Sequence, residues 1–207
     1  MQFPFYKKIF AQMMSTSSKR YNRLLENRKR ELFKEIKGKV LEIGAGTGAN
    51  LAYYPKNIEY IALEPNDAMH PYLKKEIERE GFSNTKILND SAENISFKDG
   101  NFDYVISSLV LCSVSDPKKV FEEILRVLKP GGKFLFIEHI AAPRKTLLYA
   151  FQHYLVWIWK ICGDGCNPDR ETDIVLRQTS FKDIQIEKFR LPITLFASPH
   201  MIGKATK

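Results

Sequence analysis

Apolar residues along this 207-residue chain fall into short runs that alternate with longer amphipathic stretches. Short runs bounded by Gly, Pro or Asp predict buried strands, and the amphipathic stretches predict helices. The expected strands cover 39–43, 59–63, 85–89, 102–107, 133–139, 184–189 and 201–205, and the expected helices cover about 15–36, 66–80, 117–128 and 170–179. A short helix should follow the glycine cluster, KPGG at 129–132 predicts a turn, and a long aromatic helix should follow residue 140. This alternation predicts an α/β fold with a parallel sheet covered on both faces.

The last two predicted strands should pair differently from the others. The segment between them, LPITLFASPH (191–200), is too short for a crossover helix. We therefore expect them to be antiparallel.

The first predicted helix is basic. Residues 1–39 hold eleven Lys or Arg and three Glu, which account for the whole net charge of +8, and the remainder balances at 21 of each sign. Its expected inward residues are Tyr21, Leu24, Leu25, Leu32, Phe33 and Ile36. We expect residues 1–37 to form a basic helical segment that packs on a domain spanning 38–207. Its charge suits a solvated helix face or a peripheral membrane contact, and we expect no nucleic-acid partner.

Composition narrows the class further. The apolar content of 44% suffices for a full core. The most apolar stretch, 146–159, is interrupted by Gln152 and His153 and is shorter than the ~20 residues of a spanning helix. The N-terminus has no secretory signal, and three cysteines form no disulfide framework. We expect a cytoplasmic protein, with attachment to a membrane surface as an open alternative.

A glycine loop, VLEIGAGTGAN (40–50), follows the first strand. Such a loop is typical of nucleotide-like ligands, because glycine lets the backbone approach them closely. Glu42, ahead of the bend, would repel a pyrophosphate and suits a cationic ligand such as S-adenosylmethionine. Glu64, twenty residues after Gly44, can accept both ribose hydroxyls in an NAD or an S-adenosylmethionine site. The alternative for the glycine loop is a tight turn that binds no ligand. The alternatives for the two acids are a salt bridge at the strand end for Glu42 and a helix-capping or surface role for Glu64.

Further motifs follow in order: EIGAGTG, ALEPN, SAENISF, FDYVISSLVL and LKPGG. Together, from about residue 38 to 140, they resemble class I S-adenosylmethionine-dependent methyltransferases. The resemblance implies a Rossmann-like three-layer sandwich with a mostly parallel seven-stranded sheet of order 3-2-1-4-5-7-6 and an antiparallel last strand. It implies S-adenosylmethionine as cofactor, bound by Glu42, Gly44, Ala45, Gly46, Gly48, Asn50, Glu64, Pro65, Asn66, Ser91, Ala92, Ser107 and Ser108. In that assignment the glycines pass under the methionine end, Ser91 and Ala92 flank the adenine, and Ser107 and Ser108 border the substrate.

A narrower resemblance extends over nearly the whole chain from about residue 15. KRELFKEI, SLVLCSV, EHIAAP, DGCNPDRE and PHMIGKATK are similar to motifs of the methyltransferase-like 7 family, the animal thiol S-methyltransferases. It implies a small apolar acceptor, most simply a thiol. The alternatives are N- or C-methylation of a lipid amine or quinone, and a binding module without catalysis. That family begins with a hydrophobic anchor, where MQFPFYKKIF stands here, so we expect at most peripheral membrane attachment.

Three residues are candidates for handling the acceptor. Methyl transfer is an in-line displacement, and a thiol of pKa about 8.5 needs only a modest base. His139 ends the fifth strand, at the rim where ligands bind, and is the candidate base; the alternative is a structural histidine. Asp164 and Arg170 could position the acceptor, or could form an Asp–Arg pair that closes their loop.

The remaining candidates favour structural roles. Cys162 and Cys166 are spaced C-x3-C with no histidine or further cysteine close in sequence, so we expect no metal site. Cys112 lies in an apolar run and reads as core. The aromatic helix carries Tyr149, Phe151, Tyr154, Trp157 and Trp159, and its outer face suits an apolar substrate, a lipid surface or the N-terminal helix.

Overall fold

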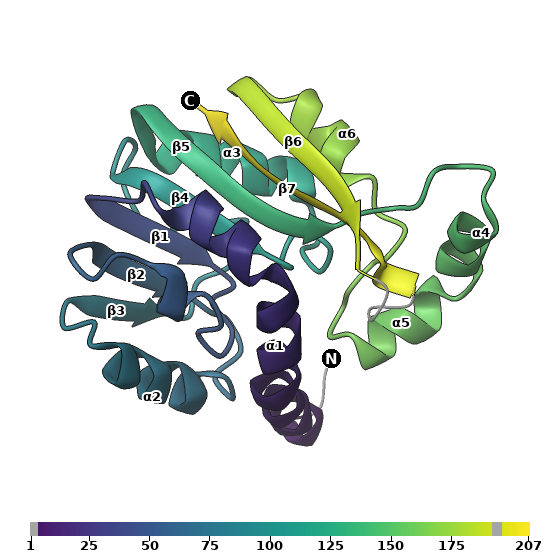
Figure 1. The fold of residues 1–207 in the computed structure, drawn as a ribbon, viewed down its shortest axis with the longest axis horizontal. Helices are drawn as coiled ribbons and strands as arrows, with labels where there is room; N and C mark the ends of the chain where they lie inside the picture. The colour runs from purple at the N-terminus through teal and green to yellow at the C-terminus, as the bar shows by residue number, and fades with distance from the viewer. Residues whose placement is uncertain (1–3, 192–195) are drawn as a thin grey trace.

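A computed structural model describes residues 4–191 and 196–207 of the chain (Figure 1). Its elements are α1 (Pro4–Phe33), β1 (Lys39–Ile43), η1 (Leu51–Tyr53), β2 (Glu59–Leu63), α2 (His70–Glu80), β3 (Thr85–Leu88), β4 (Phe102–Ser108), α3 (Pro117–Val127), β5 (Leu128–His139), α4 (Leu147–Tyr154), α5 (Val156–Cys162), α6 (Thr172–Arg177), β6 (Lys182–Arg190) and β7 (Pro199–Thr206). Residues 1–3 of the predicted basic segment and residues 192–195 of the predicted connection between the last two strands lie outside the described residues.

The strands form one mostly parallel sheet. Its order is β3-β2-β1-β4-β5-β7-β6, and β7 runs antiparallel to both of its neighbours. The predicted Rossmann-like topology is therefore confirmed, including the antiparallel β6–β7 pair that the short connection required.

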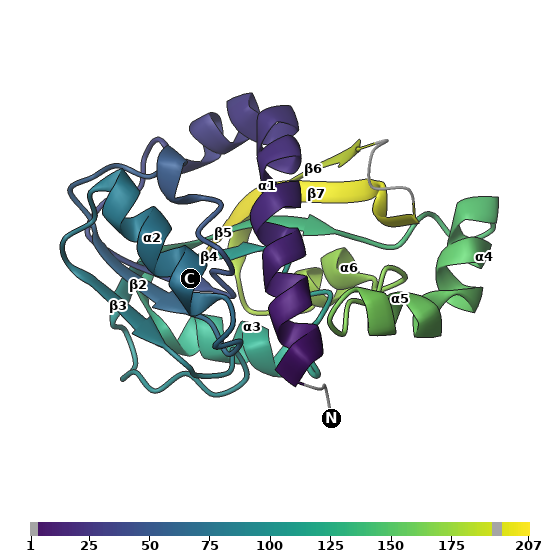
Figure 2. The ribbon, with the colours of Figure 1, turned by 90° about the horizontal axis from the view of Figure 1, so that it is seen from below.

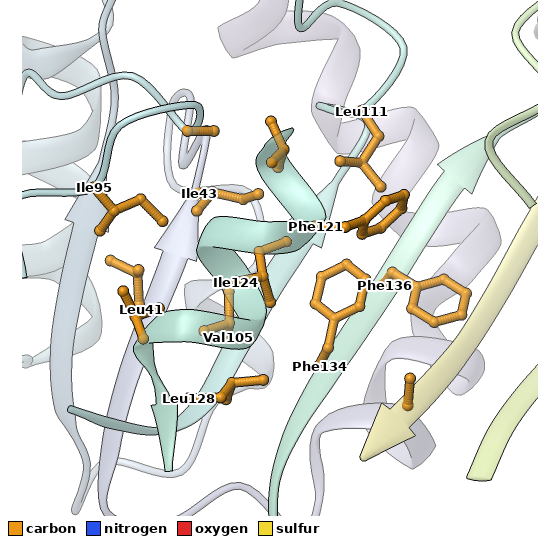
Figure 3. Close-up of a cluster of buried hydrophobic side chains, with 14 of the residues drawn as sticks. Leu41, Ile43, Ile95, Val105, Leu111, Phe121, Ile124, Leu128, Phe134 and Phe136 are labelled. Carbon is orange, nitrogen blue, oxygen red and sulfur yellow. The ribbon is translucent and has the colours of Figure 1, made fainter. Parts of the chain in front are cut away.

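Helices cover both faces of the sheet. One face packs on α3 and α6 through a cluster that includes Phe121, Ile124, Phe134 and Phe136 (Figure 3). The other face packs on α1, α2 and η1, and its cluster includes Phe33. The sheet is apolar on both faces, and helices bury each of them. The protein therefore has the three layers that continuous apolar strands predict.

The first helix is longer than expected. α1 begins at Pro4 rather than near residue 15. Ser15 and Thr16 lie inside the helix, where Ser15 Oγ and Thr16 Oγ1 donate to the carbonyls of Gln12 (2.7 Å) and Met13 (2.9 Å). In both views its first turns extend beyond the sheet toward α5 (Figure 1; Figure 2).

Other boundaries also differ. The KPGG sequence lies within β5, where Gly131 takes φ +76° and its N–H bonds to the Lys207 carbonyl at 3.3 Å. α2 starts at His70, because residues 66–69 form a turn in which the Asn66 side chain accepts the Ala68 N–H. The aromatic stretch divides into α4 and α5 at Leu155, and α6 spans only Thr172–Arg177. No helix in the described ranges is both long and apolar enough to cross a bilayer.

Two adjacent leucines of α1 test how the helix is held. Leu25 is fully buried, whereas Leu24, expected to face inward, is 46% exposed. We expect Leu25→Ala to lower the free energy of unfolding by about 2–5 kcal/mol, because it removes buried methyl groups and leaves a cavity. Leu24→Ala is the matched control and should change it by at most about 0.5 kcal/mol. Urea denaturation measures both, and equal effects of the two variants would contradict this packing.

Candidate active site

The parallel strands end at one edge of the sheet, and this edge carries the site. β1 pairs with β2 and β4, and β4 pairs with β5, all parallel, so the loops after residues 43, 63, 108 and 139 meet there. In open α/β sheets ligands bind outside the carboxyl ends of the strands.

The glycine loop is shaped to leave room for a ligand. At Gly44 (φ +59°) an added Cβ would lie 2.5 Å from Val110 Cγ2, so the loop packs closely there. At Gly46 (φ +56°) an added Cβ would meet only the Gly44 carbonyl, at 3.9 Å. Gly46 therefore combines left-handed backbone with open space, as expected where a ligand passes a backbone.

Glu64 lies beside the glycine loop. Its two carboxylate oxygens accept the N–H groups of Gly46 and Asn66, each at 2.8 Å, and the residue is 6% exposed. Burial raises the pKa of Glu64, while these two N–H groups oppose the shift. A carboxylate has about four acceptor positions, so two remain for hydroxyl donors.

A nearby donor also lacks a partner. Asn66 Nδ2 is buried and bonds to no group among the residues that the structure describes. An unpaired buried donor is costly unless a ligand meets it. Together with the free acceptor positions of Glu64 and the space at Gly46, it fits the ribose and adenine of S-adenosylmethionine.

A chain of buried polar groups runs beneath the loop. Glu42 is 1% exposed, and its carboxylate accepts Asn50 Nδ2 and the Tyr60 hydroxyl, both at 2.6 Å. Lys29 of α1 donates to Asn50 Oδ1 at 2.6 Å and to Asn22 Oδ1 at 2.6 Å. Glu42 thus holds Asn50 in place, and both oxygens of its carboxylate are occupied by protein donors.

A loop distant in sequence closes the other end of the site. Arg170 Nη1 donates to the carbonyls of Leu111 (2.6 Å) and Val114 (2.7 Å), and Asn167 Nδ2 donates to the Cys112 carbonyl (3.0 Å). These bonds fasten the segment 163–170 to the segment that follows β4. Arg170 therefore closes its loop through backbone carbonyls, whereas the alternative stated above was a pair with Asp164.

His139 contacts thiols at this junction. Its Nε2 lies 3.0 Å from Cys166 Sγ, and one ligand atom each of Cys112, His139 and Cys166 lie within 4.8 Å of one another. All three residues are buried. A hydrogen bond from Cys166 holds the pKa of the Cys112 thiol well below its usual range. Burial lowers the pKa of His139, but the charge of Cys112, a hydrogen bond to Cys112 and the charge of Glu138 together outweigh that effect and raise the pKa.

Asp164 lies between these two parts of the site. Its negative charge adds to the upward shift of the Glu64 pKa, so the 163–170 segment comes near Glu64. The Asp164 N–H also reaches the Tyr6 hydroxyl of α1 at 3.4 Å. The N-terminal helix therefore contacts the same loop that Arg170 and Asn167 fasten to the segment after β4.

Comparison with known proteins agrees with this geometry. Residues 41–136 match the family described as "Methyltransferase domain". Human thiol S-methyltransferase TMT1B is 37% identical over 99% of this chain and 88% of its own length. The chain belongs to the thiol S-methyltransferase family. It is a class I S-adenosylmethionine-dependent methyltransferase.

More distant relatives share the fold or part of the chain. The phosphatidylethanolamine N-methyltransferase of Cereibacter sphaeroides is 28% identical over 67% of this chain and 71% of its own. The methyltransferase bound to the Trm112 activator of Haloferax volcanii has a TM-score of 0.73 at 14% identity, covering 97% of this chain and 96% of that one. At this identity the second comparison supports only the fold.

The other residues that the sequence predicts to bind the cofactor lie in varied settings. Ser107 Oγ donates to Glu138 at 2.5 Å, and Ser108 is half-buried. Ala92 belongs to a hydrophobic cluster, the Ser91 hydroxyl bonds to Glu93, and Pro65 is exposed. Their contacts with a cofactor stay predictions, as do those of the loop residues Ala45 and Gly48.

Sequence reasoning missed Lys29 and the thiol partners of His139. Lys29 belongs to a run of charges that reads as solvated surface, yet it is 1% exposed. Cys112 was assigned to the core, and Cys166 was considered only with Cys162, which is exposed. The one available signal was that Cys112 and His139 both follow strands that end at the same edge.

Lys29 makes stability depend on pH. Burial lowers its pKa from 10.5 to about 7. Between these values the unfolded chain holds a proton that the folded chain has released, so stability rises with pH. The slope for one proton is about 1.4 kcal/mol per pH unit. We expect Lys29→Met to lose this contribution between pH 7.5 and about 10.

Urea unfolding at several pH values measures the slope. Lys34→Met removes an exposed lysine that directly follows the same helix and should keep the wild-type slope. Parallel profiles for the wild type and Lys29→Met would show that Lys29 keeps its proton on folding.

Proposed function

We propose that this enzyme binds S-adenosylmethionine along the glycine loop and methylates the sulfur of a small apolar thiol. When bound, the cofactor supplies a methyl group on a positively charged sulfonium. Glu64 accepts the ribose hydroxyls, Asn66 donates to the adenosine, and Gly46 leaves room for the backbone of the ligand. The observation that carries the cofactor assignment is the Glu64 carboxylate held between Gly46 N and Asn66 N at 2.8 Å, beside an open glycine.

The acceptor assignment rests on the family and on the other end of the same edge. The 37% identical relative is named a thiol S-methyltransferase. We propose that His139 helps the acceptor lose its proton and that Arg170 and Asp164 position the loop around it. Because a thiol is already a few per cent thiolate at neutral pH, little further activation is needed. Buried surroundings at His139 suit an apolar acceptor.

A lipid acceptor is the second candidate, and one surface feature favours it. Large apolar side chains are exposed on α4 and α5, namely Leu147, Phe151, Tyr154, Trp157, Ile158 and Ile161. Exposed apolar patches mark interaction surfaces, a lipid surface among them. The similarity to a phosphatidylethanolamine N-methyltransferase points the same way. On this view, peripheral membrane contact of a cytoplasmic protein would bring a lipid amine or quinone to the site.

A panel of acceptors tests the function. The full chain is incubated with methyl-labelled S-adenosylmethionine and with alkyl thiols, aryl thiols, amines, a quinol and phospholipid vesicles. We expect label in the thiols, recovered as thioethers by mass spectrometry. Label confined to amines, quinol or lipid would reject the thiol assignment, and label in no acceptor would favour a binding module without catalysis.

Glu64 tests the cofactor site separately. We expect Glu64→Gln to weaken S-adenosylhomocysteine binding by about 10- to 100-fold, because hydrogen bonds to a charged acceptor contribute about 1.5–3 kcal/mol. Glu59→Gln, at the other end of the same strand and exposed, is the matched control and should bind as the wild type does. Titration calorimetry measures both, and unchanged affinity in Glu64→Gln would remove this residue from the ribose site.

A further inference from the structure

Three metal-ligating side chains meet at the acceptor end of the site although they lie far apart in sequence. Cys112 follows β4, His139 ends β5, and Cys166 follows α5. Their ligand atoms lie within 4.8 Å of one another, with His139 Nε2 3.0 Å from Cys166 Sγ. The bonds from Asn167 and Arg170 to the segment 111–114 hold the three together.

The spacing suits a tetrahedral zinc ion. With Zn–S of about 2.3 Å and Zn–N of about 2.0 Å, ligand atoms of such an ion lie about 3.5–3.8 Å apart. The three side chains therefore need to move by only about 1 Å or less to reach those separations. Thiolates and imidazole are also the ligands that zinc prefers.

The surroundings of the cluster support an ion more than a purely structural histidine. Trp159 Nε1 donates to Cys166 Sγ at 3.1 Å, as outer hydrogen-bond donors do for metal-bound thiolates. His139 Nε2, at 3.0 Å from Cys166 Sγ, is the imidazole nitrogen that faces the cluster.

Charge favours the same assignment. Two thiolates neutralise a divalent cation, so the complete site would be electrically neutral in a buried position. Three protein ligands leave one tetrahedral position open, which is the arrangement of catalytic zinc and differs from closed structural sites. A thiolate bound there would make the site anionic, which complements a sulfonium nearby.

We propose that Cys112, His139 and Cys166 bind a zinc ion whose fourth position takes the sulfur of the acceptor thiol. This inference rests on the proposed thiol methylation and gives His139 a different part in it, because an imidazole nitrogen bound to zinc cannot also take the proton of the acceptor. The thiol loses its proton to solvent as its sulfur binds, because a coordinating thiol is deprotonated. That sulfur then forms a bond to the methyl carbon, the bond from this carbon to the sulfonium breaks, and its electron pair stays on the cofactor sulfur. The product is a neutral thioether, which binds zinc weakly and leaves.

Metal binding is measured on the full chain without the cofactor. Purified protein is stripped with a chelator, titrated with Zn²⁺ and analysed for metal content, and a parallel titration uses Co²⁺. We expect one ion per chain and, with Co²⁺, the absorption of a tetrahedral site with thiolate-to-metal charge transfer. Adding an alkyl thiol should change that spectrum. Absence of these bands in the wild type would overturn the proposal, and bands that ignore added thiol would overturn the open fourth position.

Matched variants locate the ion. Cys166→Ser and Cys112→Ser should lose Co²⁺ binding, whereas Cys162→Ser, four residues from Cys166 and exposed, should keep it. Retention of the site in Cys166→Ser would overturn the assignment. S-adenosylhomocysteine calorimetry on each variant identifies one that has unfolded, and the wild-type titration decides the proposal in that case.

Activity separates this inference from the proposed function. Removal of the ion should slow thiol methylation at pH 7 by about 10-fold or more, because few of the acceptor molecules are then thiolates. Full thiol methylation by the metal-free enzyme would overturn the zinc site alone. A formed Co²⁺ site without methylation of any thiol would overturn the thiol assignment.

Discussion

A buried lysine side chain holds the N-terminal helix to the glycine loop. Lys29 reaches Asn50, and Asn50 in turn reaches the carboxylate of Glu42 at the end of β1. Taking a lysine nitrogen and a carboxylate out of water is expensive, and the arrangement persists because each polar atom has a close partner. The glycine loop is thereby fixed from below by a helix that precedes it in the chain. Asn22 adds a second bond, from its Nδ2 to the Ala49 carbonyl at 2.7 Å.

The opposite end of the site is organised by backbone carbonyls. Arg170 and Asn167 bring a loop from beyond β5 onto the segment after β4, and so place Cys166 beside His139. One end of the edge therefore offers the carboxylate of Glu64 as acceptor and the amide nitrogen of Asn66 as donor, while the other is buried and rich in sulfur. This division matches a reaction in which a polar cofactor meets an apolar sulfur nucleophile.

The sequence predicted what depends on local pattern. The strands 39–43 and 59–63 were placed at their observed bounds, since apolar runs between turn residues are a local signal. The cofactor loop and Glu64 followed from a motif whose parts lie within one β-α-β unit. The first helix was expected from about residue 15 but begins at Pro4, and Ser15 and Thr16 bond back to carbonyls of their own helix.

Contacts between segments that lie far apart in the chain could not be predicted from local sequence patterns. Lys29 and Glu42 have no sequence relation that marks them as neighbours, and a lysine in a charged run is ordinarily solvated. Likewise Cys112, His139 and Cys166 come together only once the sheet order is set and Arg170 has found its carbonyl acceptors. Their chemistry is visible in the sequence, but their proximity is a property of the fold.

The contact between Tyr6 and Asp164 joins the first turns of α1 to the 163–170 loop, although the two segments lie far apart in the chain. Helix ends open locally at a lower free-energy cost than core strands do. Fraying of this helix end would therefore remove a contact of the loop that also carries Cys166, while the sheet stays intact.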